Sequence, residues 1–168
     1  MAFVLMLSGA GVKAGDITWE STKALVRSHF PDAAQVSVVD LADALEGTDA
    51  PVLIDVREPA EYAVSHLPGA FHAQGAALRA LVDEIGADRP VVLYCSVGYR
   101  SSREAQALRR KGFENVSNLD GSIFEWANTG HVLVQGGPEA ETPTDFVHPF
   151  NDKWGVLLEA DRRSYEPR

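Results

Sequence analysis

The single cysteine of the chain, Cys95, occupies a position that favours a reactive thiolate. An apolar run leads into it, a short loop containing Gly98 follows, and a helix is expected to begin near Ser101. The positive end of that helix dipole, the unpaired N–H groups of the loop and the adjacent Arg100 all stabilise thiolate over thiol. A buried cysteine that only fills space is the common alternative for a lone cysteine. The position between strand and helix favours a nucleophile.

The loop after Cys95 is suited to binding an anion, because Gly98 permits the positive φ at which successive N–H groups point inward. It is therefore expected to hold the thiolate and an anion derived from it. The loop residues are Ser96, Val97, Gly98, Tyr99, Arg100 and Ser101. Arg100 has two interpretations. It attracts an anionic substrate, or it forms an internal ion pair with a carboxylate such as Asp55 or Glu58, and one residue can serve both roles.

A second polar group begins at Asp55, which ends another apolar run. We expect Asp55 to cap the turn after its own strand; the alternative is that it accepts hydrogen bonds from the Cys95 loop. Arg57 is expected to pair with Glu58 or Glu61 inside the fold. Asp55 and Arg57 are therefore predicted to support the site without reacting.

Short apolar runs alternate with helical patterns along the chain. We expect strands over residues 36–39, 52–55, 91–94 and 116–119. We expect helices over residues 19–30, 78–85 and 101–111, another that is capped by Asp40 and ends at Gly47, and one turn over 123–127. This order predicts an α/β domain with a mainly parallel central sheet flanked by helices on both faces. Ligands of such sheets bind beyond the carboxyl ends of the strands, where Asp55 and Cys95 both lie.

Composition narrows the functional classes. The chain of 168 residues has 15 Lys and Arg against 24 Asp and Glu, a formal net charge of −9. This balance argues against binding nucleic acid or an anionic membrane through a general basic surface. Five histidines and one cysteine, with no CxxC pair, predict no metal site and no disulfide, and we expect no cofactor.

The chain divides into three expected parts: an N-terminal segment with a short helix (1–35), a central domain (36–132) and a C-terminal extension (133–168). Residues 1–14 weakly resemble an export signal, since 2–7 are apolar and 12–14 resemble a cleavage site, but no Lys or Arg precedes the apolar run. We favour a cytoplasmic location, with export as the alternative.

The C-terminal extension is expected to begin with a loop over residues 135–144. The aromatic-rich stretch 146–158 is expected to pack back on the domain, because exposing it to water is unfavourable. Residues 159–168 are expected to fray. A sharper hypothesis is that His148 or Trp154 borders the Cys95 pocket and shapes the choice of acceptor.

Three ordered blocks resemble the rhodanese family. Residues 55–70 contain Asp-Val-Arg-Glu, Glu-Tyr and Ser-His-Leu-Pro-Gly-Ala; residues 92–101 read Val-Leu-Tyr-Cys-Ser-Val-Gly-Tyr-Arg-Ser; residues 119–126 read Leu-Asp-Gly-Ser-Ile-Phe-Glu-Trp. The resemblance spans about residues 36–132. It implies a single-domain, thiosulfate-type sulfurtransferase in which Cys95 attacks a sulfane sulfur and carries it as a persulfide. Implied partners are a small anionic sulfur donor such as thiosulfate, a thiol or cyanide acceptor, or a protein persulfide.

Two alternatives stay open. Cdc25-like phosphatases and arsenate reductases resemble rhodaneses in fold. Their active-site loop, however, is a longer Cys-x5-Arg loop, and a histidine usually precedes its cysteine. Here the spacing from Cys95 to Arg100 is Cys-x4-Arg and Tyr94 precedes the cysteine, which disfavours that chemistry. A non-catalytic binding module is the other alternative, although inactive relatives typically lack the cysteine.

Overall fold

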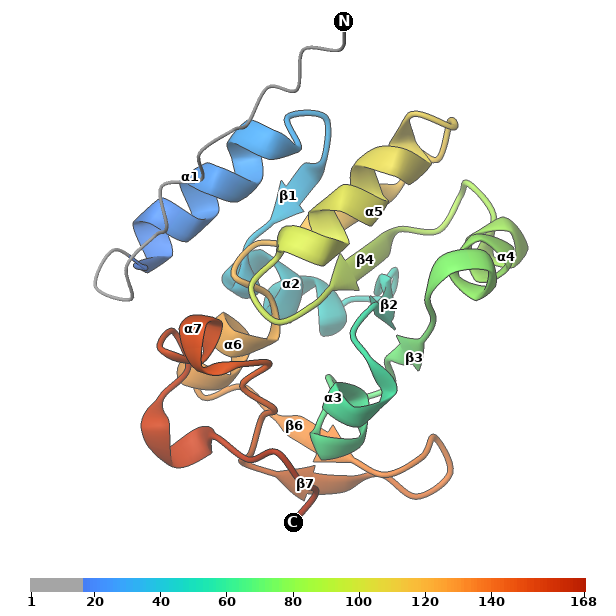
Figure 1. Cartoon of the computed structure of the whole chain (residues 1–168). Helices are drawn as coiled ribbons and strands as arrows, with labels where there is room; N and C mark the ends of the chain where they lie inside the picture. Colours follow the sequence, from blue (N-terminus) through green and yellow to red (C-terminus); the bar gives the residue numbers. More distant parts are fainter. Residues whose placement is uncertain (1–16) are drawn as a thin grey trace, which may run out of the picture.

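The centre of the computed structural model, which describes residues 17–168, is a parallel sheet (Figure 1). Its strands are β1 (Ala34–Val36), β2 (Val52–Asp55), β3 (Phe71–His72), β4 (Val91–Tyr94) and β5 (Val116–Leu119). They are ordered β1-β5-β4-β2-β3, and all neighbouring pairs are parallel. β2 and β4 are buried along their whole length, as continuously apolar runs in a covered sheet should be. The signal-like segment 1–14 lies outside the described residues.

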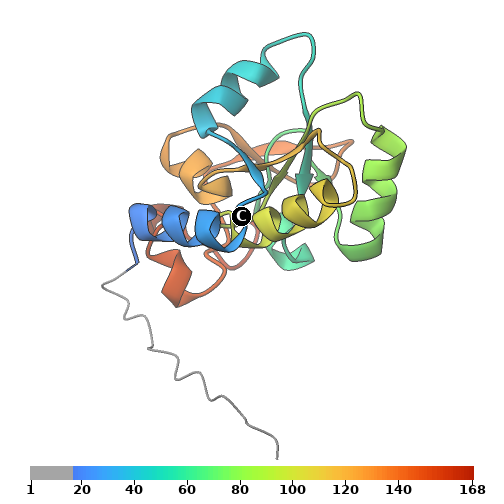
Figure 2. The ribbon, with the colours of Figure 1, turned by 90° about the horizontal axis from the view of Figure 1, so that it is seen from above.

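Helices cover both faces of the sheet (Figure 2). They are α1 (Trp19–His29), α2 (Val38–Leu45), α3 (Pro59–Val64), α4 (Gly75–Ile85), α5 (Tyr99–Arg109), α6 (Ser122–Asn128) and α7 (Asp152–Gly155). Alternate residues of β4 belong to two apolar clusters: Leu93 packs with α1, α4 and α5, whereas Tyr94 packs with α2 and α6. The predicted α/β fold with a mainly parallel sheet is confirmed. Within residues 17–168, no helix is long and apolar enough to cross a membrane.

The first strand is shorter than predicted, and the next helix is capped by a different residue. β1 ends at Val36, and Ser37 caps α2 by accepting a hydrogen bond from the Asp40 N–H at 3.1 Å. The expected strand through residue 39 and the expected cap at Asp40 are therefore wrong. Burial of Val38 and Leu41 on one face of α2 outweighs the strand preference of the β-branched pair at 38–39.

The helix after the Cys95 loop begins two residues earlier than predicted, at Tyr99, and ends at Arg109. Gly98 takes the cap position with a φ of 96°, a conformation that L side chains rarely adopt. Between β2 and α4, two elements escaped prediction, α3 and the short strand β3. In α3, Pro59 stands in the first turn, where its missing N–H costs nothing.

The C-terminal extension contains more structure than expected. Where a loop was predicted over 135–144, β6 (Leu133–Gln135) pairs antiparallel with β7 (Thr142–Thr144). The expected fraying of 159–168 is also wrong. A 3-10 turn spans Ala160–Arg162, and the Ser164 N–H donates to the Val147 carbonyl at 3.1 Å. The stretch 146–158 packs on the α2 and α6 face, where it buries Val147, Leu157 and Leu158.

Candidate active site

Cys95 lies at the carboxyl end of β4, between the ends of its neighbours β2 and β5. Its backbone is held by the start of α6. The Cys95 N–H donates to the Ser122 hydroxyl at 3.2 Å, and the Cys95 carbonyl accepts from the Ile123 N–H at 3.2 Å. Ser122 has a φ of 51°, unusual for a residue with a side chain, and its hydroxyl also donates to the Leu119 carbonyl. This role of Ser122 could not be predicted from its sequence surroundings, beyond its place in a block that resembles the family.

The Gly98 N–H donates to the Cys95 sulfur, with the nitrogen 3.2 Å from Sγ. Hydrogen bonding from Val97 and Ser101 of the same loop also favours a lower pKa of this thiol. Burial opposes the charged thiolate, but the positive charge of Arg100 and these hydrogen bonds outweigh it and lower the pKa of Cys95. The loop therefore stabilises a sulfur anion.

Arg100 forms an ion pair with Glu61 of α3. Its Nη1 lies 2.7 Å from Oε2 and its Nη2 lies 2.7 Å from Oε1. The Ser96 hydroxyl joins this pair, donating to Glu61 Oε1 at 2.8 Å and accepting from Arg100 Nη2 at 2.9 Å. Burial would raise the pKa of Glu61, yet the hydrogen bonds and charge of Arg100 lower it. The expected internal ion pair exists, but its partner is neither Asp55 nor Glu58.

Asp55 and Arg57 form a fully buried pair at the end of β2, where Asp55 is in register with Tyr94 of β4. Arg57 Nη2 lies 2.7 Å from Asp55 Oδ2, and the Arg57 N–H donates to Asp55 Oδ1 at 2.9 Å. Asp55 thus caps the turn after its own strand. The expected pairing of Arg57 with Glu58 or Glu61 is wrong, because Asp55 is within reach of both the backbone and the side chain of Arg57. The pair fixes the segment that leads into α3 and so supports Glu61.

Cys95 lines a pocket of about 370 Å³, although only 1% of the residue is exposed. The pocket is lined by Leu25, His29, Cys95, Ser96, Val97, Tyr99, Arg100, Phe150 and Trp154. Its walls come from α1, the start of α5 and the C-terminal extension. Sequence reasoning missed Leu25, His29 and Phe150, since nothing local connects α1 or residue 150 with the loop.

The extension reaches the pocket through Phe150 and Trp154. Trp154 lines it, as hypothesised, whereas His148 does not. His148 instead accepts a hydrogen bond from the Phe150 N–H through Nδ1 at 3.0 Å, and its ring meets Tyr165 edge-on. The Phe150 ring covers the Arg100 guanidinium, whose carbon lies 4.6 Å from the ring centroid. His148 therefore contacts the pocket wall through its hydrogen bond with Phe150.

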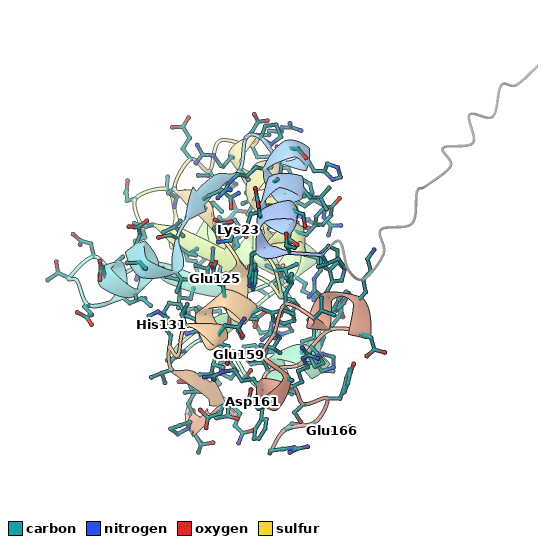
Figure 3. All side chains as sticks on the ribbon, turned by 90° about the vertical axis from the view of Figure 1, so that its left-hand side faces the viewer. Lys23, Glu125, His131, Glu159, Asp161 and Glu166 are labelled. Atoms are coloured by element: carbon teal, nitrogen blue, oxygen red, sulfur yellow. The ribbon has the colours of Figure 1, made fainter. Side chains whose placement is uncertain are left out.

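Ion pairs hold α1 in place as a pocket wall. Lys23 of α1 lies 2.7 Å from Glu125 of α6, and the two side chains meet on the face seen in Figure 3. Arg27 pairs with Asp120 at 2.7 Å. Because Leu25 and His29 stand on the same helix, these pairs also fix the pocket residues that α1 supplies.

The histidines near the site form hydrogen bonds with other residues of the fold and do not converge on a common point. His29 Nδ1 lies 2.9 Å from the Tyr99 hydroxyl, and His72 Nε2 lies 2.6 Å from the Arg57 carbonyl. Among residues 17–168, no group of three or more His, Cys, Asp or Glu is placed to hold a metal ion. Cys95 is the described residue suited to covalent chemistry in the pocket.

Comparisons with known proteins agree with this geometry. The family model described as a rhodanese-like domain matches residues 37–129, more than half of the chain. The uncharacterized protein YqhL of Bacillus subtilis (strain 168) is 43% identical over 74 residues. These residues are 44% of this chain and 59% of YqhL, so the chain spans less than two thirds of that relative.

Solved structures resemble the fold as well. A thiosulfate sulfurtransferase from Pseudomonas aeruginosa is 22% identical with a TM-score of 0.62, covering 82% of this chain and 26% of that protein. The rhodanese-like domain of the Alr3790 protein from Anabaena sp is 30% identical with a TM-score of 0.52, covering 66% of this chain and 84% of that domain.

Proposed function

Because this chain belongs to the rhodanese-like domain family, we propose that it is a sulfurtransferase whose nucleophile is Cys95. One observation carries the proposal: the Gly98 N–H, in the loop between β4 and α5, donates to the Cys95 sulfur at 3.2 Å. A thiolate held in this way is the reactive form of cysteine. Its position in a pocket gives a small donor access to it.

The reaction proceeds in two balanced displacements. In the first, the Cys95 thiolate attacks the outer sulfur of a persulfide or of thiosulfate, a new S–S bond forms, and the thiolate or sulfite leaves with the electron pair of the old bond. In the second, an acceptor thiolate or cyanide attacks the outer sulfur of the Cys95 persulfide, and the Cys95 thiolate leaves. No external oxidant or reductant is consumed. Two easier steps replace one difficult transfer, and ping-pong kinetics are expected.

The loop stabilises both states of the enzyme. Hydrogen-bond donors fixed before the reaction need no reorganisation when the negative charge moves from the thiolate to the persulfide. The charge of Arg100 favours both anions. Arg100 also forms an ion pair with Glu61, and this pair joins the first turn of α5 to α3.

Phosphate chemistry receives less support than sulfur transfer. A phosphatase loop of the related type needs room for a tetrahedral anion and an arginine free to bind it. Here the Cys-x4-Arg loop is one residue shorter, and both terminal nitrogens of Arg100 are bonded to Glu61. A binding module without catalysis is the remaining alternative, and it predicts no sulfur on Cys95.

Intact-mass spectrometry tests the proposal directly. After incubation with thiosulfate, or separately with a low-molecular-weight persulfide, the wild-type chain is expected to gain one sulfur that cyanide removes as thiocyanate. Cys95→Ser is expected to gain none. A wild-type chain that gains no sulfur from any donor would overturn the proposal in favour of a binding role. Turnover of a phosphate or arsenate substrate would favour the rival chemistry.

A further inference from the structure

The walls of the Cys95 pocket are largely apolar and aromatic. Leu25, Tyr99, Phe150 and Trp154 surround the polar floor at Cys95. Leu25 is 36% exposed and Phe150 is 39% exposed, so both offer apolar surface to a ligand. Covering such surface favours binding in proportion to the apolar area removed from water.

The positive charge at the pocket is shared with a buried carboxylate. Among the described residues that line it, Arg100 is the only Lys or Arg. The edge of its guanidinium bonds Glu61 and Ser96, and the Phe150 ring covers its face. The whole chain carries a net charge of −9, which does not attract a dianion from a distance. Charge therefore gives thiosulfate little advantage over a neutral molecule.

Phe150 is held in the pocket against its own backbone preference. Its φ is 63°, a region that bulky side chains rarely adopt. The His148 ring and the Phe150 N–H stabilise this conformation through their 3.0 Å hydrogen bond. Backbone strain of this kind gathers at ligand clamps, so the strained backbone of Phe150 supports a role of its ring in holding a ligand.

The size of the pocket agrees with a ligand larger than an inorganic anion. Its volume of about 370 Å³ lies within the range of roughly 300–1,000 Å³ that small-molecule sites occupy. Thiosulfate is a compact tetrahedral anion and would leave the apolar walls uncovered.

We propose that the sulfur carrier served by Cys95 is a small thiol and its persulfide with an aromatic or alkyl body, which Leu25, Phe150 and Trp154 hold while its sulfur meets Cys95. This inference rests on the proposed sulfur transfer and names its substrate class. The transferred sulfur enters and leaves by the two displacements already given.

Two thiols of similar acidity test the substrate class. Cys95 is first loaded with whichever donor gives the persulfide, and transfer to 2-phenylethanethiol and to 2-mercaptoethanol is then compared. The apolar thiol is expected to show a kcat/KM about tenfold higher, as burial of a phenyl group predicts. Equal values, or a preference for the polar thiol, would overturn the inference and point to an acceptor recognised outside this pocket, such as a protein.

Substitutions in the pocket wall test whether Leu25 and Phe150 cause the preference for the apolar thiol. In Phe150→Ala and Leu25→Ala, the ratio of kcat/KM for 2-phenylethanethiol to that for 2-mercaptoethanol is expected to fall to about threefold or less. Phe146→Ala is the matched control, since this aromatic residue of the same extension packs on Arg168 and does not line the pocket. A preference that survives Phe150→Ala contradicts the assignment.

A binding measurement separates this inference from the proposed function. Methyl 2-phenylethyl sulfide cannot accept sulfur, and its binding is measured by calorimetry whether or not Cys95 forms a persulfide. Binding that weakens about tenfold in Phe150→Ala but not in Phe146→Ala supports the pocket, even where no donor loads Cys95 and sulfur transfer fails. If Cys95 forms a persulfide but methyl 2-phenylethyl sulfide does not bind, the inferred substrate class is wrong and the proposed sulfur transfer stands.

Discussion

Arg100 and Glu61 meet through two hydrogen bonds of 2.7 Å, one to each carboxylate oxygen, beside the Cys95 pocket. The guanidinium that stabilises the Cys95 thiolate is therefore shared with a second anion. Glu61 is almost wholly buried, with 3% of its side chain exposed, so water screens this sharing weakly. The pair sets how much positive charge reaches the sulfur.

Removing the charge of Arg100 and removing the charge of Glu61 should shift the pKa of Cys95 in opposite directions. Arg100→Gln is expected to raise it, with about tenfold less thiolate at neutral pH, because an opposite charge near a thiolate is lost. Glu61→Gln is expected to lower it by a smaller amount, because the carboxylate no longer offsets the guanidinium. The rate of Cys95 alkylation by iodoacetamide, measured against pH, reports both pKa values.

A charge change elsewhere on the same helix is the control for that pair. Arg103 of α5 pairs with Glu104 and is 62% exposed, so Arg103→Gln is expected to leave the alkylation profile unchanged. If Arg100→Gln and Glu61→Gln shift the profile in the same direction, the shared-charge account is wrong.

The lowered pKa of Cys95 makes the stability of the fold depend on pH. An unfolded cysteine titrates near pH 8.5, and the folded value lies lower. The thiolate therefore stabilises the fold fully above the unfolded pKa, and this contribution is lost as the pH falls through the folded pKa. The free energy of unfolding of wild type, relative to Cys95→Ala, is expected to increase as the pH rises from the folded pKa to the unfolded pKa of about 8.5, and to level off above it. Urea unfolding measures it, and a difference that does not vary with pH would contradict the expectation.

Local patterns predicted much of the fold, because continuously apolar runs and punctuating glycines carry information within a few residues. The strands at 91–94 and 116–119 have the expected bounds, and so Cys95 stands at a strand end as expected. The cap of α2 was missed because Ser37 precedes a β-branched pair that also suits a strand. Local preference cannot decide between these outcomes without the packing of Leu41.

The parts of the site that escaped prediction depend on contacts between distant residues. Glu61 and Arg100 lie 39 positions apart, and several carboxylates near Asp55 were equally plausible partners from sequence. Phe150 reaches the pocket only because the extension folds across α6 and the end of the sheet. The amides around Cys95 were predictable, since a glycine loop between strand and helix dictates them locally.

The buried pair of Asp55 and Arg57 should contribute strongly to stability. Asp55→Asn leaves Arg57 without its charge partner in a site where both side chains are 0% exposed. The expected loss in the free energy of unfolding is about 3–5 kcal/mol. Asp32→Asn is the control, because it removes an exposed pair with Arg110 and should cost within about 1 kcal/mol. Urea unfolding compares them, and similar losses for the two variants would refute the assigned role.

The loop should require glycine at position 98 for two reasons, the positive φ of the backbone and the close approach of Asn118. Its φ is 96°, and an added Cβ would lie 3.3 Å from Asn118 Nδ2, so Gly98→Ala disturbs the loop whose N–H bonds the sulfur. Gly112 has nearly the same φ, 99°, but an added Cβ there meets nothing within 4 Å, so Gly112→Ala isolates the conformational cost of about 1 kcal/mol. Gly98→Ala is expected to lose more than that in urea unfolding and to raise the pKa of Cys95 in the alkylation profile, whereas Gly112→Ala leaves the profile unchanged. A normal alkylation profile in a folded Gly98→Ala chain would show that the thiolate does not depend on this turn.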